Sequence, residues 1–106
     1  MMTRKEILTT AEKCVCGDRE QDYGTPEKNF NTIADLWSTY LYSVGLINNS
    51  DPTVWNRVTA KDVAAMLALL KIARIASGHA KADNWIDLAG YAACGGEIEG
   101  GADNGC

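Results

Sequence analysis

The chain has 106 residues, of which 46% are apolar and 23% charged, and these proportions describe one globular domain with no room for a second. Fourteen Asp and Glu residues against ten Lys and Arg residues give a net charge of −4. This acidic balance argues against DNA, RNA or an anionic membrane as the main partner. We expect a cytoplasmic protein, because the N-terminal sequence turns polar at once and leads to no apolar segment of signal-peptide length.

The first predicted helix covers about residues 4–16. Apolar side chains recur at helical spacing from Ile7 to Val15, and Thr3 has the position of an N-cap residue in a capping box. Segment 18–24 is too polar to continue this periodicity and ends in glycine, which predicts an ordered turn.

The second predicted helix has a well-marked beginning. Thr25 is suited to the N-cap, Pro26 to the first helical position, and Glu27 to the positive end of the helix dipole. Its apolar face extends from Phe30 to the neighbourhood of Gly45. A loop of roughly a dozen residues follows, which is long for a compact domain.

The third predicted helix is the most apolar part of the sequence. Thr59 and Asp62 form a capping-box pair, and residues 63–76 are apolar at every position except Lys71 and Arg74. A helix that is apolar on nearly all sides is expected at the centre of the fold.

The fourth predicted helix begins near Asp83 or Asn84, either of which can serve as N-cap, and places Trp85 on its apolar face. We assign residues 1–95 to a single helical domain and residues 96–106, which are rich in glycine, to a flexible C-terminal tail. The predicted fold is all-α, a compact four-helix bundle.

Two charged stripes are the main candidates for a functional site. Lys71 and Arg74 share one face of the third helix, while Asp83, Asp87 and Tyr91 follow one another at intervals of four on the fourth helix. A short connection makes these helices neighbours, so the stripes are expected to face each other. The charges then form internal ion pairs, or part of the positive charge remains for the phosphates of a ligand.

Other familiar sites are absent or less specific. The sequence has no Gly-rich phosphate loop, and its four cysteines lack zinc-site spacing, so we expect free thiols. Tyr23 and Tyr91 are candidates for stacking on a base, because each lies among polar residues. Arg19 belongs either to a solvated turn or to a phosphate contact.

Three blocks of sequence resemble a family of small phage and prophage proteins, which is itself similar to MazG-like helical domains. The blocks are Asp18-Arg19-Glu20-x-Asp22-Tyr23-Gly24-x-Pro26-Glu27-x-Asn29-Phe30, then Asp62-Val63-Ala64 with Leu69-Leu70-Lys71-Ile72-Ala73-Arg74, and then Asp83-Asn84-x-x-Asp87-Leu88-Ala89-Gly90-Tyr91-Ala92. The resemblance implies a MazG-like all-α fold, a homo-oligomer, and a nucleotide site with Mg²⁺ held by acidic residues. The paired acidic motif of the first MazG helix has no counterpart in this sequence.

The leading functional hypothesis is a phage-encoded helical protein that binds a nucleotide or nucleotide-derived small molecule without a cofactor, for example to sequester a host immune signal. The expected ligand contacts are Arg19, Tyr23, Lys71, Arg74, Asp87 and Tyr91. A first alternative is a Mg²⁺-dependent nucleotide pyrophosphohydrolase, with Asp62, Asp83 and Asp87 as metal ligands and Glu27 supplied by a neighbouring subunit. A second alternative is a protein-binding adaptor.

Overall fold

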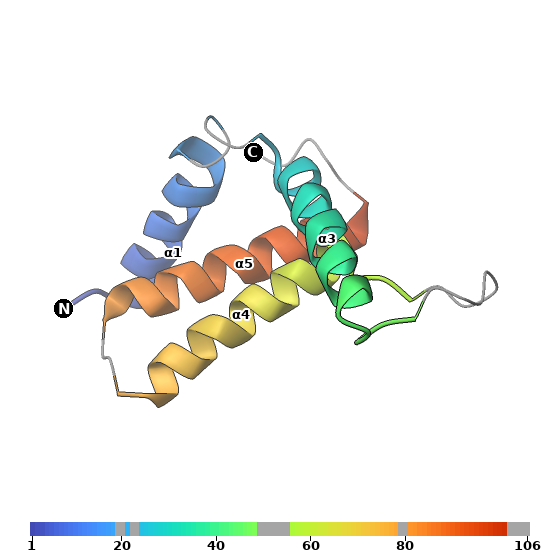
Figure 1. Ribbon diagram of the computed structural model, residues 1–106. Helices are drawn as coiled ribbons and strands as arrows, with labels where there is room; N and C mark the ends of the chain where they lie inside the picture. The colour runs from blue at the N-terminus through green and yellow to red at the C-terminus, as the bar shows by residue number, and fades with distance from the viewer. Residues whose placement is uncertain (19–20, 22–23, 49–55, 79–80, 102–106) are drawn as a thin grey trace.

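The computed structural model describes residues 1–18, 21, 24–48, 56–78 and 81–101 (Figure 1). In chain order the elements are α1 (Arg4–Lys13), the π-helical turn η1 (Cys14–Asp18), α3 (Pro26–Ser43), α4 (Ala60–Ala76) and α5 (Ala82–Gly100). The described ranges contain four α-helices and no β-strand, so the predicted all-α class is confirmed.

The predicted beginnings of α1 and α3 are confirmed by their caps. The Thr3 hydroxyl oxygen accepts a hydrogen bond from the Glu6 backbone N–H at 3.1 Å. The Thr25 hydroxyl oxygen accepts one from the Lys28 backbone N–H at 3.4 Å, with Pro26 in the first turn. Each of these bonds satisfies a backbone donor that the helix itself leaves unpaired.

The two remaining helices begin differently. At α4, the Thr59 backbone N–H and hydroxyl both donate to Asp62 Oδ2 at 2.9 Å, as the capping pair predicts. At α5, the N-cap is Lys81, which makes no side-chain capping bond. The predicted capping role of Asp83 or Asn84 is therefore wrong, and both residues lie inside the first turns of the helix.

The far half of α5 also departs from the prediction. The helix continues to Gly100, past the predicted domain boundary at residue 95. It does so because Gly95 packs closely on α4, where an added Cβ would lie 3.2 Å from the Ala64 Cβ. Trp85, which was expected on the apolar face, is instead exposed.

The cysteine prediction is correct in part. Cys14, in η1, and Cys94, in α5, lie outside any disulfide. Cys16 is disulfide-bonded, so the expectation of free thiols is wrong at this residue.

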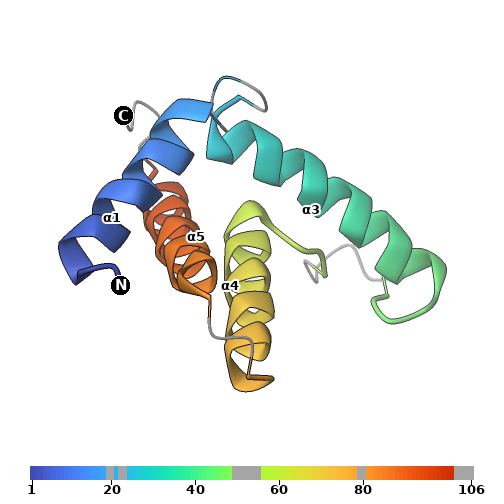
Figure 2. The same cartoon turned by 90° about the vertical axis from the view of Figure 1, so that its left-hand side faces the viewer.

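The antiparallel pair α4 and α5 forms the centre of the molecule (Figure 1). Seen from the side, the helices follow the order α1, α5, α4, α3, and the start of α3 meets η1 above α5 (Figure 2). The core lies where α3, α4 and α5 converge. Its buried residues are Phe30, Ala34, Val58, Ala60, Val63, Ala64 and Cys94.

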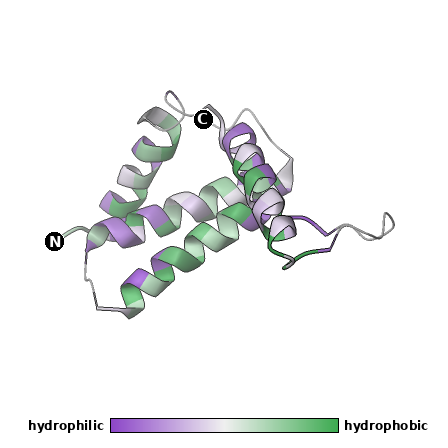
Figure 3. Ribbon diagram, viewed as in Figure 1, coloured by the Kyte–Doolittle hydropathy of each residue, from purple (hydrophilic) through white to green (hydrophobic). Residues whose placement is uncertain are grey.

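The arrangement is more open than the predicted compact bundle. The Cα radius of gyration is 15.5 Å, compared with about 13 Å for a compact domain of this length. Apolar residues occupy nearly all of α4, including parts of its surface that no described helix covers (Figure 3). The sequence pattern therefore predicted the apolar character of α4, but not that one of its sides stays exposed.

Candidate functional site

The centre of the candidate site is an ion pair between α4 and α5. Lys71 Nζ lies 2.8 Å from Asp87 Oδ2, and the two side chains are 10% and 29% exposed. This contact confirms that the charged stripes of the two helices face each other. It also matches the structural interpretation of Lys71, because the ammonium group has an internal counter-ion.

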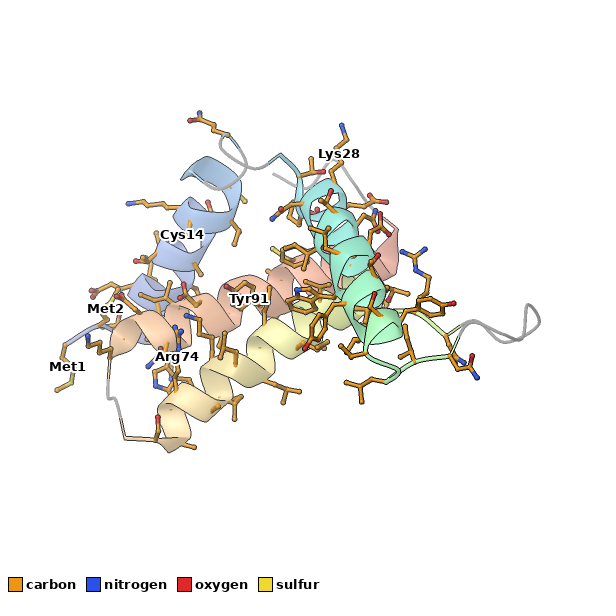
Figure 4. The ribbon with its side chains drawn as sticks, viewed as in Figure 1. Met1, Met2, Cys14, Lys28, Arg74 and Tyr91 are labelled. Atoms are coloured by element: carbon orange, nitrogen blue, oxygen red, sulfur yellow. The ribbon has the colours of Figure 1, made fainter. Side chains whose placement is uncertain are left out.

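Arg74 and Asp83 lie about one helical turn from this ion pair, and they do not form a second ion pair with each other. Because α4 and α5 are antiparallel and Lys71 meets Asp87, Arg74 lies level with the first turn of α5, which carries Asp83. Both side chains are exposed and form no ion pair with any other residue that the structure describes. Figure 4 shows Arg74 between α4 and α5, and Tyr91 farther along α5.

A pocket adjoins the ion pair on the side of α5 that faces η1 and the start of α3. We call it the α5 pocket, and it is lined by Cys14, Val15, Gly24, Pro26, Asn29, Phe30, Ile86, Asp87, Gly90, Tyr91 and Cys94. The enclosed space of this pocket is small, about 30 Å³, and the pocket opens to the surface. The walls are mostly apolar, with polar groups from Asn29, Asp87 and Tyr91, which is the composition typical of a small-molecule site.

The local sequence explains how this pocket forms. Gly90 lets η1 approach α5 closely, since an added Cβ would lie 3.0 Å from Val15 Cγ1. Phe30, one turn into α3, is buried beneath the same region. Tyr91 is half-buried and also packs against the main core. Most of the lining residues lie on α3 and α5, which hold those side chains in fixed positions, and the rest lie in η1 and just before α3.

Arg19 and Tyr23 lie outside the described residues. Among the described residues near them in the sequence, Val15 and Gly24 line the α5 pocket. Arg19 and Tyr23 therefore stay predictions from the sequence.

The carboxylates that were considered as metal ligands are distributed over both ends of the helical pair. Asp62 is in the first turn of α4, which lies beside the end of α5, whereas Asp83 and Asp87 are in the first two turns of α5. The rise of an α-helix separates these positions by about 15–20 Å. Among the residues described, no three His, Cys, Asp or Glu side chains are grouped for a metal ion. The proposed trio is therefore not assembled within one chain.

Asp62 has a structural task in this chain. The backbone N–H and the hydroxyl of Thr59 donate hydrogen bonds to its carboxylate and lower the pKa of Asp62 below the ordinary value of 3.8. Lys61 adds a smaller attraction in the same direction. The ionised carboxylate is thus engaged in holding the start of α4.

Several pocket residues were not selected from the sequence. The sequence pattern places Cys14, Val15 and Phe30 on the apolar faces of predicted helices, and Asn29 lies in the first of the three sequence blocks without a predicted role in the site. A spacing pattern alone gives no sign that η1 and α3 meet over the same part of α5. The close pair of Gly90 and Tyr91 is the sequence signal that could have located the pocket.

Comparison with known proteins places the chain in a family. A model described as "Domain of unknown function (DUF6378)" matches residues 6–99. The chain belongs to this family. Its relatives include the Gene 55 protein of Mycobacterium phage L5, which is 42% identical over 86 residues, covering 81% of this chain and 47% of the relative. The Gene 55 protein of Mycobacterium phage D29 is 34% identical over 90 residues, covering 85% and 51%.

The DUF6378 chain spans about half the length of these phage relatives. No solved structure matches it significantly. None of the helices in the described ranges is both long and apolar enough to cross a membrane.

Proposed function

We propose that this DUF6378 protein binds a nucleotide or nucleotide-derived small molecule in the α5 pocket and holds it intact, as a phage protein that sequesters a host immune signal would. One observation carries the proposal. A mostly apolar pocket contains Asp87 and Tyr91, and Arg74 presents an exposed guanidinium near the same ion pair. An open apolar surface with a few polar groups suits stacking of a base, and an exposed guanidinium suits phosphate.

The spacing along α5 supports this division of roles. Tyr91 is eight residues beyond Asp83, which corresponds to about 12 Å of helix, and Arg74 is level with the Asp83 turn. Tyr91 would stack on the base, and Asp87 Oδ1 would accept a ribose hydroxyl while Oδ2 stays with Lys71. The phosphates would extend along α5 toward Arg74. Arg19 and Tyr23 remain ligand contacts expected from the sequence.

The position of Asp62 supports retention of the ligand rather than its hydrolysis. Phosphoanhydride hydrolysis with Mg²⁺ needs several carboxylates close together, and in this chain Asp62 is distant from Asp83 and Asp87. We therefore propose sequestration as the outcome of binding, with the magnesium-dependent pyrophosphohydrolase as the alternative that the experiment detects.

The test is calorimetric titration with nucleosides, mononucleotides and cyclic dinucleotides in the presence of Mg²⁺, followed by chromatography of the recovered ligand. We expect binding with intact ligand recovered. Arg74→Gln should weaken binding of phosphate-bearing ligands about tenfold and leave binding of the matching nucleoside unchanged. Lys61→Gln is the matched control, because Lys61 is an exposed cation at the other end of α4.

Two results would contradict the proposal. One is the absence of binding by every compound in the panel. The other is release of phosphate or pyrophosphate that Asp87→Asn abolishes, which would establish the MazG-like enzyme instead.

A further inference from the structure

The outer side of α4 has a surface that the rest of the described chain leaves uncovered. We define the outer α4 face as Ala65, Met66, Leu69, Leu70, Ile72, Ala73 and Ala76, all of which are exposed. Between Lys61 and Arg74, every exposed residue of α4 is apolar. Leu69, at the middle of the face, is 65% exposed. A helix that is apolar all round is normally buried on all sides.

The total surface area gives a measure of what is missing. The accessible surface is 7446 Å² for a mass of 11.4 kDa, which exceeds the value expected of a compact monomer by about 1,700 Å². Each partner in an interface of standard size contributes about 800 Å². The excess belongs to the whole chain, and the exposed apolar residues of the outer α4 face contribute to it together with others such as Leu36 and Tyr40 on α3.

We propose that the outer α4 face is a self-association surface, occupied by the same face of a second copy of this chain. The absence of charge favours this occupant, because two copies that each carry a net charge of −4 can meet there without like charges in contact. A surface that pairs with itself about a two-fold axis must also be complementary to itself.

The order of large and small residues on α4 provides this complementarity. In an antiparallel pair centred between Leu69 and Leu70, Met66 of one copy faces Ala73 of the other, so a long side chain lies opposite a methyl group. The same pairing brings the start of α4, with its positive dipole end, to the negative end of the other α4. The helices can then pack closely along the face.

This surface is separate from the α5 pocket. The pocket is lined by residues of η1, α3 and α5, together with residues just before α3, and includes no residue of α4. Arg74, the proposed phosphate contact, belongs to α4 and lies next to Ala73 of this face, so the two proposals are told apart with a nucleoside, whose binding does not use Arg74. A chain that fails to self-associate would leave nucleoside binding unchanged.

The experiment is analytical ultracentrifugation of the wild-type chain and two variants of matched exposure. Leu69→Glu introduces a charge at the middle of the outer α4 face, and Leu36→Glu introduces one on α3, where Leu36 is also 65% exposed. We expect the wild type and Leu36→Glu to sediment as dimers at micromolar concentration, and Leu69→Glu as a monomer. Circular dichroism of each variant should show unchanged helix content, and ligand affinity should be the same in all three.

Three results would overturn the proposal. They are a wild-type chain that stays monomeric at every concentration tested, a Leu69→Glu variant that remains dimeric, and a Leu36→Glu variant that dissociates to the same extent as Leu69→Glu. The first would indicate that a different protein or a longer chain covers the face, and the last that α3 forms the contact.

Discussion

The ion pair between Lys71 and Asp87 shows how single residues define the centre of the molecule. Lys71 is an ammonium group in the most apolar helix, and it is nearly buried while Asp87 is partly exposed. The two partners therefore differ in what their loss would cost, because an unpaired charge is more expensive in a buried position.

We predict that Asp87→Asn destabilises the chain more than Lys71→Met does. The first change leaves a buried ammonium without its counter-ion and should cost about 2–3 kcal/mol of unfolding free energy. The second leaves a partly exposed carboxylate and adds an apolar side chain, so its cost should be less than half as large. Urea denaturation of both variants measures the difference, and equal or reversed costs would contradict this description of the pair.

At Asp62 the prediction concerns pH. Its pKa is lowered by hydrogen bonds from Thr59, so its contribution to stability is present above the ordinary value near 3.8 and is lost as the pH falls through the lower folded-state value. Asp62→Ala should lower the unfolding free energy by about 1 kcal/mol at pH 7. In thermal denaturation the gap between variant and wild type should narrow below pH 4. A gap that persists to pH 2 would show that the carboxylate charge plays no part.

At the scale of helices, the close packing of α5 on α4 depends on a glycine at position 95. Gly95 faces Ala64 at close range, whereas nothing lies within 4 Å of a Cβ added at Gly96. Both residues are in the same helix with ordinary helical φ, so they form a natural comparison.

We predict opposite effects of alanine at these two neighbouring positions. Gly96→Ala should stabilise the chain by about 0.5–1 kcal/mol, because alanine favours the helix and meets no neighbour. Gly95→Ala should give no gain or a net loss, since the Ala64 Cβ moves only if α4 and α5 separate. Thermal melting of the two variants provides the comparison. A gain of equal size at both positions would mean that the helices are less closely packed than described.

The elements also differ in how far the sequence determines them. The starts of α1, α3 and α4 follow from local capping residues, and the structure confirms them. The start of α5 was misplaced because several adjacent polar residues are equally suited to a cap. Its end was misplaced because local propensity disfavours glycine, whereas packing of Gly95 on α4 stabilises the helix there.

At the scale of the whole molecule, the described helices form an open arrangement, with the α5 pocket on one side of α5 and an uncovered apolar face on α4. The sequence predicted the all-α class and the meeting of the Lys71 and Asp87 stripes. Gly90 and Tyr91 mark the α5 side of the pocket in the sequence, but its other walls were not predictable, because they depend on where η1 and α3 meet in space rather than on any spacing within one helix. The apolar sequence pattern of α4 likewise does not say whether other helices cover all of its sides, because that also depends on how the helices are arranged in space.

In the function proposed above, the α5 pocket holds a nucleotide-like ligand. The most direct test of this proposal is two-dimensional amide NMR of the labelled chain during titration with the nucleotide that binds most tightly in calorimetry. We predict shifts concentrated at Asn29, Asp87, Gly90 and Tyr91, with little change at Leu69 on the outer α4 face. Shifts that leave these four amides unmoved and fall elsewhere would contradict the proposal, as would a spectrum that no nucleotide alters.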